Sequence, residues 1–271
     1  MPEEPILARI ADALDRLSPP PPPLADPLAH PAYVWRGDTL TAARDFGALP
    51  LALLQNIDLQ KATLVANIER LAAGAAAHDA LLWGARGTGK SALVKSAVAH
   101  VQAVGGNIAL IEVVTTRLET LPALFAAIAP VDRAFVLFID DLGFDAAGDA
   151  RALRSMLQGG AEARPANARL IVTSNRRHLI PRDIAEQESA INPRDAVDDQ
   201  LALADRFGLS LGFHVLDQDG YLAIVQAYAA AHGLPFDAAE AVGWATRRGG
   251  RSGRVAWHYI VDLAGRHGQS I

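Results

Sequence analysis

The sequence predicts an α/β fold, with a parallel five-stranded sheet flanked by helices and a C-terminal helical lid. Three observations predict it. Short apolar runs alternate with helical patterns between about residues 76 and 215, the first of these runs leads into a glycine-rich loop, and only helical patterns follow beyond residue 215. Such alternation favours a parallel sheet whose strands are joined by crossover helices.

The five strands are expected where apolar residues follow one another with little interruption. These runs are Leu81 to Trp83, Ile108 to Val114, Phe135 to Ile139, Leu170 to Thr173 and Leu209 to Phe213. Two helical patterns lie between them. Ser91 to Val101 ends at a pair of glycines, and Arg117 to Ala129 is closed by a proline.

Beyond the last strand, three helices are expected to form the lid. The first covers Tyr221 to His232 and ends at Gly233. Asp237 is expected to cap the second, with Glu240 reaching back to it as in a capping box. Ser252 is expected to cap the third.

Ahead of the sheet the pattern is less regular. Apolar residues at helical spacing predict a helix from about Glu3 to Leu17, and Pro19 to Pro23 predict an extended spacer. Leu24 to Leu54 shows no assignable pattern, whereas Asp58 to Ala73 is expected to be a helix. Four segments follow from this: the N-terminal helix and spacer in 1–23, an extension packing on the core in 24–75, the core in 76–215 and the lid in 216–271.

Composition narrows the class of protein. The chain has 271 residues, of which 51% are hydrophobic, enough for a sizeable core. A net charge of -5 and a pI near 5.9 argue against a surface devoted to nucleic acid or acidic membranes. The absence of cysteine excludes disulfides, thiol catalysis and thiolate metal sites. No secretory signal or membrane-spanning run is recognisable, so a cytoplasmic location without membrane contact is expected.

The glycine-rich loop after the first strand fits the P-loop pattern in full: Gly84-Ala85-Arg86-Gly87-Thr88-Gly89-Lys90-Ser91. A strand precedes it and a helix follows it. The N–H groups of the loop and of the helix N-terminus should therefore face one anion, as a triphosphate requires. Lys90 is expected to reach the outer phosphates and the Ser91 hydroxyl to bind magnesium, which makes ATP and Mg²⁺ the expected ligands.

The strand Phe135 to Ile139 ends in two carboxylates, Asp140 and Asp141, which matches a Walker B segment. Asp140 is expected to hold Mg²⁺ through water. Asp141 stands where AAA enzymes usually carry the Glu that activates the attacking water. Because Asp is one methylene shorter than Glu, this departure puts the rate of hydrolysis in question, but not the binding of nucleotide.

Two further polar residues complete the expected catalytic set. Asn175 follows the strand Leu170 to Thr173 at the carboxyl edge of the sheet, where its amide would orient the lytic water. The alternative is an Asn that only forms a turn. Arg206 precedes the last strand and is either an arginine finger for the γ-phosphate of a neighbouring subunit, which requires a homo-oligomer, or a surface ion pair with Asp205.

Four arginines gather around the start of the last helix, between residues 247 and 254. Cations at a helix N-terminus oppose its macrodipole, so an anion such as the phosphates of a nucleotide is expected to offset them. Arg254 is the better candidate for this contact and Arg251 the second. The alternative, which is not favoured, is a basic patch for nucleic acid that includes the run 176–178.

Taken together, these motifs resemble a family of bacterial AAA-type ATPases catalogued as a domain of unknown function. The resemblance runs from about Tyr33 to the C-terminus and rests on four segments: Leu82 to Ser91, Asp140 to Leu142, Thr173 to Leu179 and Arg248 to Arg254. It implies a P-loop NTPase core of the AAA+ type with a helical lid, and Asp-Asp as the usual Walker B ending. It also implies residue roles: phosphate and Mg²⁺ for Lys90 and Ser91, metal and water for Asp140 and Asp141, sensing for Asn175, and a contribution from the lid by Arg254.

The sequence therefore predicts an enzyme that hydrolyses ATP and, through the angle between core and lid, remodels or recruits an unidentified protein partner. One alternative is a nucleotide-gated binding protein with negligible turnover, in which Asp141 is too short to act. The other is a P-loop kinase that transfers the γ-phosphate to a small molecule.

Overall fold

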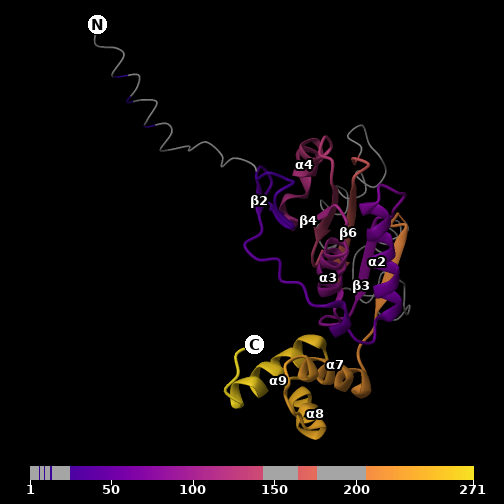
Figure 1. The fold of residues 1–271 in the computed structure, drawn as a ribbon, viewed down its shortest axis with the longest axis vertical. Coiled ribbons are helices and arrows are strands. Elements are labelled where there is room, and N and C mark those ends of the chain that lie inside the picture. The colour runs from indigo at the N-terminus through magenta and orange to yellow at the C-terminus, as the bar shows by residue number, and fades with distance from the viewer. Residues whose placement is uncertain (1–5, 7–8, 10–12, 14–24, 143–163, 176–205) are drawn as a thin grey trace, which may run out of the picture.

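The computed structural model describes residues 25–142, 164–175 and 206–271, together with the isolated positions 6, 9 and 13. Figure 1 shows a sheet flanked by helices, with α7, α8 and α9 gathered beyond one end of it. Apart from those isolated positions, the predicted N-terminal helix and proline spacer lie outside the described residues.

Within the described residues, seven strands form one sheet in the order β2-β1-β4-β5-β6-β3-β7. All neighbours run parallel except β1 and β2, which form an antiparallel pair. The five predicted strands are present as β3 to β7, and the predicted α/β class is confirmed. The bounds of the strands are β1 Ala32–Trp35, β2 Leu40–Ala42, β3 Ala80–Gly84, β4 Ile108–Val113, β5 Ala134–Ile139, β6 Ala168–Ser174 and β7 Leu209–Phe213.

The prediction of five strands was wrong in number, because β1 and β2 extend the sheet of the described chain to seven. Both come from the segment to which no regular structure could be assigned. Tyr33, Trp35 and Leu40 anchor them in the core beneath the sheet. With four and three residues, these strands are too short for a periodic pattern to stand out in the sequence.

Helices cover both faces of the sheet. Helices α2 (Asp58–Ala72) and α3 (Lys90–Ala103) pack on one face, and α4 (Leu121–Ile128) packs on the other. Alternate residues of a strand point to opposite faces, so in β3 Leu82 lies in the core beneath α2 and α3, whereas Leu81 lies in the core beneath α4. Because helices cover both faces of the sheet, both sides of such a strand are buried, and this explains the continuous apolar runs in the sequence.

The helix predicted from Arg117 to Ala129 is divided in two. A 3-10 helix, η2, covers Thr115–Thr120, and α4 follows it with Pro122 in its first turn. Arg117 has φ -132° and ψ 27°, which is not helical. Proline suits the first turn of a helix because its missing N–H has no partner there in any case, so the regular α-helix begins next to Pro122.

The lid is formed by α7 (Gln218–Ala231), α8 (Ala238–Arg247) and α9 (Gly253–Arg266). Their facing sides share an apolar core that is separate from the two cores of the sheet. The 3-10 helix η1 (Leu51–Leu53), which precedes α2, packs Leu53 against this core. The segment before α2 therefore contacts the lid as well as the sheet.

Two of the predicted caps in the lid are confirmed. The side chains of Asp237 and Ser252 accept hydrogen bonds from the N–H groups of Glu240 and Val255, at 2.7 and 3.2 Å. The reciprocal half of the expected capping box is not formed, because the Glu240 carboxylate pairs with Arg266 of α9 at 2.8 Å instead. A cation on the neighbouring helix is a stronger partner for a carboxylate than a single backbone N–H.

No helix among the described residues is both long and apolar enough to cross a membrane. Strands β1 and β2 place part of the segment 24–75 in the same sheet as the strands of segment 76–215. The division of the chain into extension, core and lid at residues 75 and 215 stays a prediction.

Candidate nucleotide-binding site

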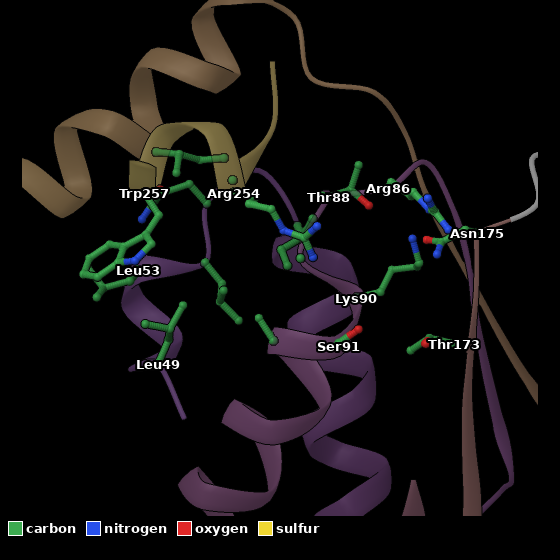
Figure 2. A pocket seen from close by; sticks show the side chains of 18 of the residues that line it. Leu49, Leu53, Arg86, Thr88, Lys90, Ser91, Thr173, Asn175, Arg254 and Trp257 are labelled. Carbon is green, nitrogen blue, oxygen red and sulfur yellow. The ribbon is translucent and has the colours of Figure 1, made fainter. Parts of the chain in front are cut away.

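A cavity of about 570 Å³ lies between the carboxyl end of the sheet and the lid. Its walls come from the P-loop, from the ends of β5 and β6, from α7 and α9, and from the segment around η1. Figure 2 shows that the two ends of the cavity differ in chemistry. Lys90 and Asn175 lie at a polar end, whereas Leu53 and Trp257 lie at an apolar end.

The P-loop, from Gly84 to Ser91, joins β3 to α3 beneath the polar end. Gly84 has φ +132°, and a Cβ there would lie 2.0 Å from the carbonyl oxygen of Phe213, so only glycine fits. In the described chain no side chain caps the first turn of α3. The N–H groups of that turn are thus available to an anion, and the glycines keep the loop open to it.

Lys90 is buried at the base of this loop, with only 5% of its surface exposed. Its Nζ donates hydrogen bonds to the carbonyl oxygens of Gly84 and Ala85, at 3.0 and 2.7 Å. Burial lowers the pKa of Lys90, and the nearby carboxylates of Asp141 and Asp140 oppose that shift. A buried ammonium held mainly by neutral carbonyls is well placed to bind a phosphate.

Asp140 lies at the end of β5 and binds two hydroxyl groups. Ser91 Oγ and Thr173 Oγ1 both donate to its Oδ1, each at 2.6 Å. Oxygen ligands of this kind suit Mg²⁺. The described residues contain no group of three or more His, Cys, Asp or Glu side chains that could hold a metal. Mg²⁺ at Ser91 and Asp140 would therefore need phosphate oxygens as further ligands, as in other P-loop proteins.

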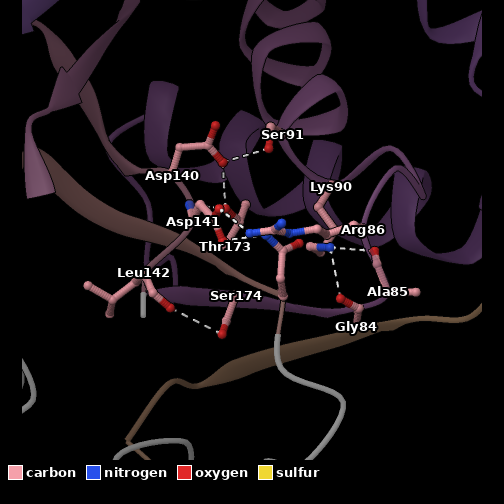
Figure 3. A network of polar contacts seen from close by, with 11 residues as sticks. Gly84, Ala85, Arg86, Lys90, Ser91, Asp140, Asp141, Leu142, Thr173 and Ser174 are labelled. Atoms are coloured by element: carbon pink, nitrogen blue, oxygen red, sulfur yellow. Dashed lines mark hydrogen bonds and ion pairs between the residues drawn. The ribbon is translucent and has the colours of Figure 1, made fainter. Parts of the chain in front are cut away.

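Asp141 has both carboxylate oxygens engaged (Figure 3). Its Oδ1 accepts a hydrogen bond from the amide of Asn175, and its Oδ2 lies 3.5 Å from Nη2 of Arg86. Its backbone N–H donates to Thr173 Oγ1 at 2.8 Å, and its φ is +51°. Asp and Asn adopt this left-handed conformation more readily than Glu, which gives a physical reason for the Asp that departs from the usual motif.

The lid reaches this site through the first turn of α9. Both Arg251 and Arg254 are exposed, but of the two only Arg254 lines the cavity. The N–H of Gly253 donates to the carbonyl oxygen of Gly87 at 2.8 Å. The structure thus brings Arg254 to the same cavity as the P-loop, the two carboxylates of β5 and the amide after β6.

Sequence reasoning missed the apolar end of the cavity. Leu49, Leu53 and Ile57 line it from the segment before α2, and Tyr228 and Trp257 line it from the lid. The Tyr228 and Trp257 rings meet edge to face, with centroids 5.3 Å apart. Helical spacing had indicated only that these aromatic residues belong to the lid. A wall of this kind can accept a flat, largely apolar group such as a nucleobase.

Arg206 does not line the cavity of its own chain. It precedes β7, whose first residue Leu209 pairs with Ala80 at the start of β3, so the length of the sheet separates Arg206 from the P-loop. Its Nη1 is buried and has no hydrogen-bond partner in the part of the chain that the structure describes. Its alternative partner Asp205 and the basic run 176–178 lie outside the described residues. The arginine finger stays a prediction.

Comparison with solved structures places the fold. The structure of the Aeropyrum pernix ORC1 protein in complex with DNA has a TM-score of 0.52 and 14% identity, and the match covers 83% of this chain and 66% of that one. A single-residue variant of Thermotoga maritima RuvB has a TM-score of 0.50 and 18% identity, covering 81% of this chain and 66% of that one. These likenesses concern the fold alone, a mostly parallel sheet flanked by helices and followed by a helical region.

The chain spans only part of these proteins, for example 64% of the Thermotoga maritima RuvB Holliday junction branch migration motor. Among curated proteins, none matches this sequence. The resemblance to a family catalogued by its unknown function is confirmed by a match that covers most of the chain. The family described as a protein of unknown function, DUF815, matches residues 28–267, and the chain belongs to that family.

Proposed function

We propose that this chain is an AAA-type ATPase, which hydrolyses ATP with Mg²⁺ and thereby remodels or recruits a protein partner. One observation carries the proposal: a single cavity is lined by the P-loop from Arg86 to Ser91, by Asp140 and Asp141, by Asn175 and by Arg254 of the lid. Phosphate-binding groups lie at one end of this cavity and apolar side chains at the other. ATP has the same division between its triphosphate and its base.

The residues of the polar end divide the work of binding. Lys90 and the N–H groups of the P-loop would hold the phosphates, while Ser91 and Asp140 would hold Mg²⁺. When bound, Mg²⁺ neutralises charge on the phosphate oxygens. Arg254 would bring a further positive charge from the lid, so that the same phosphates are held by both sides of the cavity.

Hydrolysis requires a base near the γ-phosphate, and Asp141 is the candidate. The oxygen of a water would bond to the γ-phosphorus, the bond to the β-γ bridging oxygen would break, and the water's proton would pass to the Asp141 carboxylate. Asn175, already bonded to Asp141, would orient that water. Because core and lid both line the cavity, the loss of the γ-phosphate would change their relative angle, and the partner would respond to that change.

ATP binding and phosphate release test this proposal. We expect Lys90→Ala to weaken ATP binding by about tenfold or more, because a charge-assisted contact to phosphate is lost. Lys95→Ala is the matched control, since Lys95 lies on the same helix, pairs with Glu112 and does not line the cavity. Normal ATP binding by Lys90→Ala would refute a P-loop nucleotide site.

The role of Asp141 is tested by Asp141→Asn, which retains a residue suited to the left-handed backbone. Stability should be kept and ATP binding should not weaken, whereas hydrolysis should fall by about 10² to 10⁴-fold because the general base is lost. Unchanged hydrolysis would show that another group accepts the proton.

A second function is favoured by one observation, the engagement of both Asp141 oxygens by Asn175 and Arg86. A general base whose oxygens are both engaged is poorly placed to accept a proton from water, which supports a nucleotide-gated binding protein with negligible turnover. Single-turnover assays with excess protein separate the two functions. Release of phosphate at a rate that depends on Asp141 supports the ATPase, and its absence supports the binding protein.

A homo-oligomer remains part of the proposal through Arg206. Because Arg206 lies away from the cavity of its own chain, it would act on the γ-phosphate of a neighbouring subunit. Measurement of mass in solution with ATP, combined with the ATPase rate of Arg206→Ala, tests this role. A monomer with ATP, together with a fully active Arg206→Ala, would exclude it.

A further inference from the structure

Arg86 is the third residue of the P-loop and the only one with a guanidinium. Its side chain is 79% exposed, lines the same cavity as Lys90 and lies 3.5 Å from Oδ2 of Asp141. Within the described part of the chain, Asp141 is its one polar partner. Figure 3 shows the side chain of Arg86 directed toward Asp141.

The contact between Arg86 and Asp141 adds little to the stability of the fold. Both side chains are more than half exposed, and the separation of 3.5 Å is at the long limit of a hydrogen bond. Ion pairs of this kind are screened by water and cost side-chain entropy to maintain. The contact is therefore easily exchanged for a better one.

A terminal phosphate is a better partner for Arg86 than Asp141 is. It carries more negative charge than a carboxylate, and it offers three oxygens to the planar fork of a guanidinium. Lys90 is buried at the base of the loop, whereas Arg86 is exposed and lies beside Asp141. Both cations line the same cavity, so they can bind different oxygens of one phosphoryl group.

We propose that Arg86 binds the γ-phosphate and that this contact replaces its contact with Asp141. The inference rests on the proposed function, since it assumes that a nucleoside triphosphate binds at the P-loop. Arg86 then has two effects. It distinguishes ATP from ADP, because only ATP carries the γ-phosphate, and it frees Oδ2 of Asp141 to accept a proton from water.

Affinity measurements test the discrimination without any need for turnover. The dissociation constants of ADP and of a non-hydrolysable ATP analogue are compared for wild type, Arg86→Ala and Arg86→Lys. Arg86→Ala should weaken binding of the analogue by about tenfold or more and binding of ADP by less than about threefold. Arg86→Lys should recover part of the lost affinity for the analogue. Lys95→Ala is the control, because this cation of α3 pairs with Glu112 and does not line the cavity.

A double-mutant cycle tests the exchange between partners. If Arg86 must leave Asp141 to bind phosphate, Asp141→Asn should raise the affinity for the analogue. In a protein that also carries Arg86→Ala, part of this gain in affinity should vanish. Equal gains in both backgrounds would overturn the exchange. An equal loss of ADP and analogue affinity in Arg86→Ala, or no loss, would overturn the γ-phosphate contact.

The outcomes keep this inference separate from the proposed function. If Lys90→Ala leaves ATP binding unchanged, the nucleotide site itself is wrong, and the inference falls with it. If Lys90→Ala abolishes binding while Arg86→Ala leaves the ratio of ATP to ADP affinity unchanged, the site stands and only the role of Arg86 is wrong.

Discussion

Gly253 of the lid donates its backbone N–H to the carbonyl oxygen of Gly87 in the P-loop, at 2.8 Å. The contact is close enough that a Cβ on Gly87 would lie 2.7 Å from the Cβ of Ser252, the N-cap of α9. The first turn of α9 therefore rests directly on the loop that would bind phosphate. A change in the P-loop reaches the lid through backbone atoms, without an intervening side chain.

The hydrogen bond between Gly253 and Gly87 is tested by Gly253→Pro. Proline is tolerated at the first position of a helix but has no N–H to donate, and its ring would meet the Gly87 oxygen. Helix α9 should therefore persist while its contact with the P-loop is lost. We expect ATP affinity to fall by about two- to tenfold, as calorimetry would measure. Gly253→Ala keeps the donor and should bind ATP normally. Equal affinities for the two variants would show that the bond does not matter.

Gly84→Ala should destabilise the fold strongly. The new Cβ would lie 2.0 Å from a backbone oxygen of β7, and φ is +132°. We expect a loss of about 3 kcal/mol or more in the free energy of unfolding, measured by urea denaturation. Gly74→Ala provides the comparison, because Gly74 has φ +71° but no atom within 4 Å of the Cβ position. It should lose only about 1 kcal/mol. Similar losses would contradict the steric argument.

Trp257→Ala should weaken the binding of ATP without weakening the binding of tripolyphosphate. Trp257 lines the apolar end of the cavity, where the base would lie, and stacking of an aromatic side chain on a base contributes about 1 to 3 kcal/mol. Competition of each ligand with a fluorescent nucleotide measures the two affinities. Trp244→Ala removes a tryptophan from the same lid outside the cavity and controls for lost packing. An equal loss of affinity for both ligands in Trp257→Ala would show that the adenine base does not bind at Trp257.

Stability should fall at alkaline pH because of Tyr221. Burial raises the pKa of Tyr221 to about 12, and its hydroxyl donates to the carbonyl oxygen of Ala241 at 3.2 Å. The unfolded chain loses this proton near its ordinary pKa of about 10, before the folded chain does, so rising pH favours unfolding between these values. A series of urea titrations should show this as a fall of up to about 3 kcal/mol in the free energy of unfolding. Tyr221→Phe should reduce that slope, and an unchanged slope would contradict the assignment.

Much of the fold was predictable because its signals are local. The strands β3 to β7 coincide with short apolar runs of the sequence, and the caps at Asp237 and Ser252 depend on residues within the same turn. Strands β1 and β2 could not be predicted. Strand β1 is held by pairing with β4 and by the burial of Tyr33 and Trp35, and β2 is held by pairing with β1. The distant pairing with β4 is not visible in nearby sequence.

In the candidate site, too, the residues with local sequence signals could be predicted and those placed by distant contacts could not. Motifs indicated the P-loop, the carboxylates after β5 and Asn175, because each ends a strand at the same edge of a parallel sheet. The apolar wall of Leu53 and Trp257 depends on how the lid packs against the core, so neither residue carries a local signal of its position. The left-handed backbone of Asp141 was also invisible, although it accounts for the choice of Asp over Glu.

The two strands that the sequence concealed determine which strand the sheet exposes at one side. Without them, β4 would be the edge strand. It has six residues, of which five are buried, and its unpaired backbone groups would form a template for association with other chains. The outer strand is instead β2, with three residues and one fully buried side chain. The hairpin of β1 and β2 thus protects the protein from edge-to-edge aggregation, and a chain shortened to begin after Ala42 would tend to precipitate rather than remain a smaller folded protein.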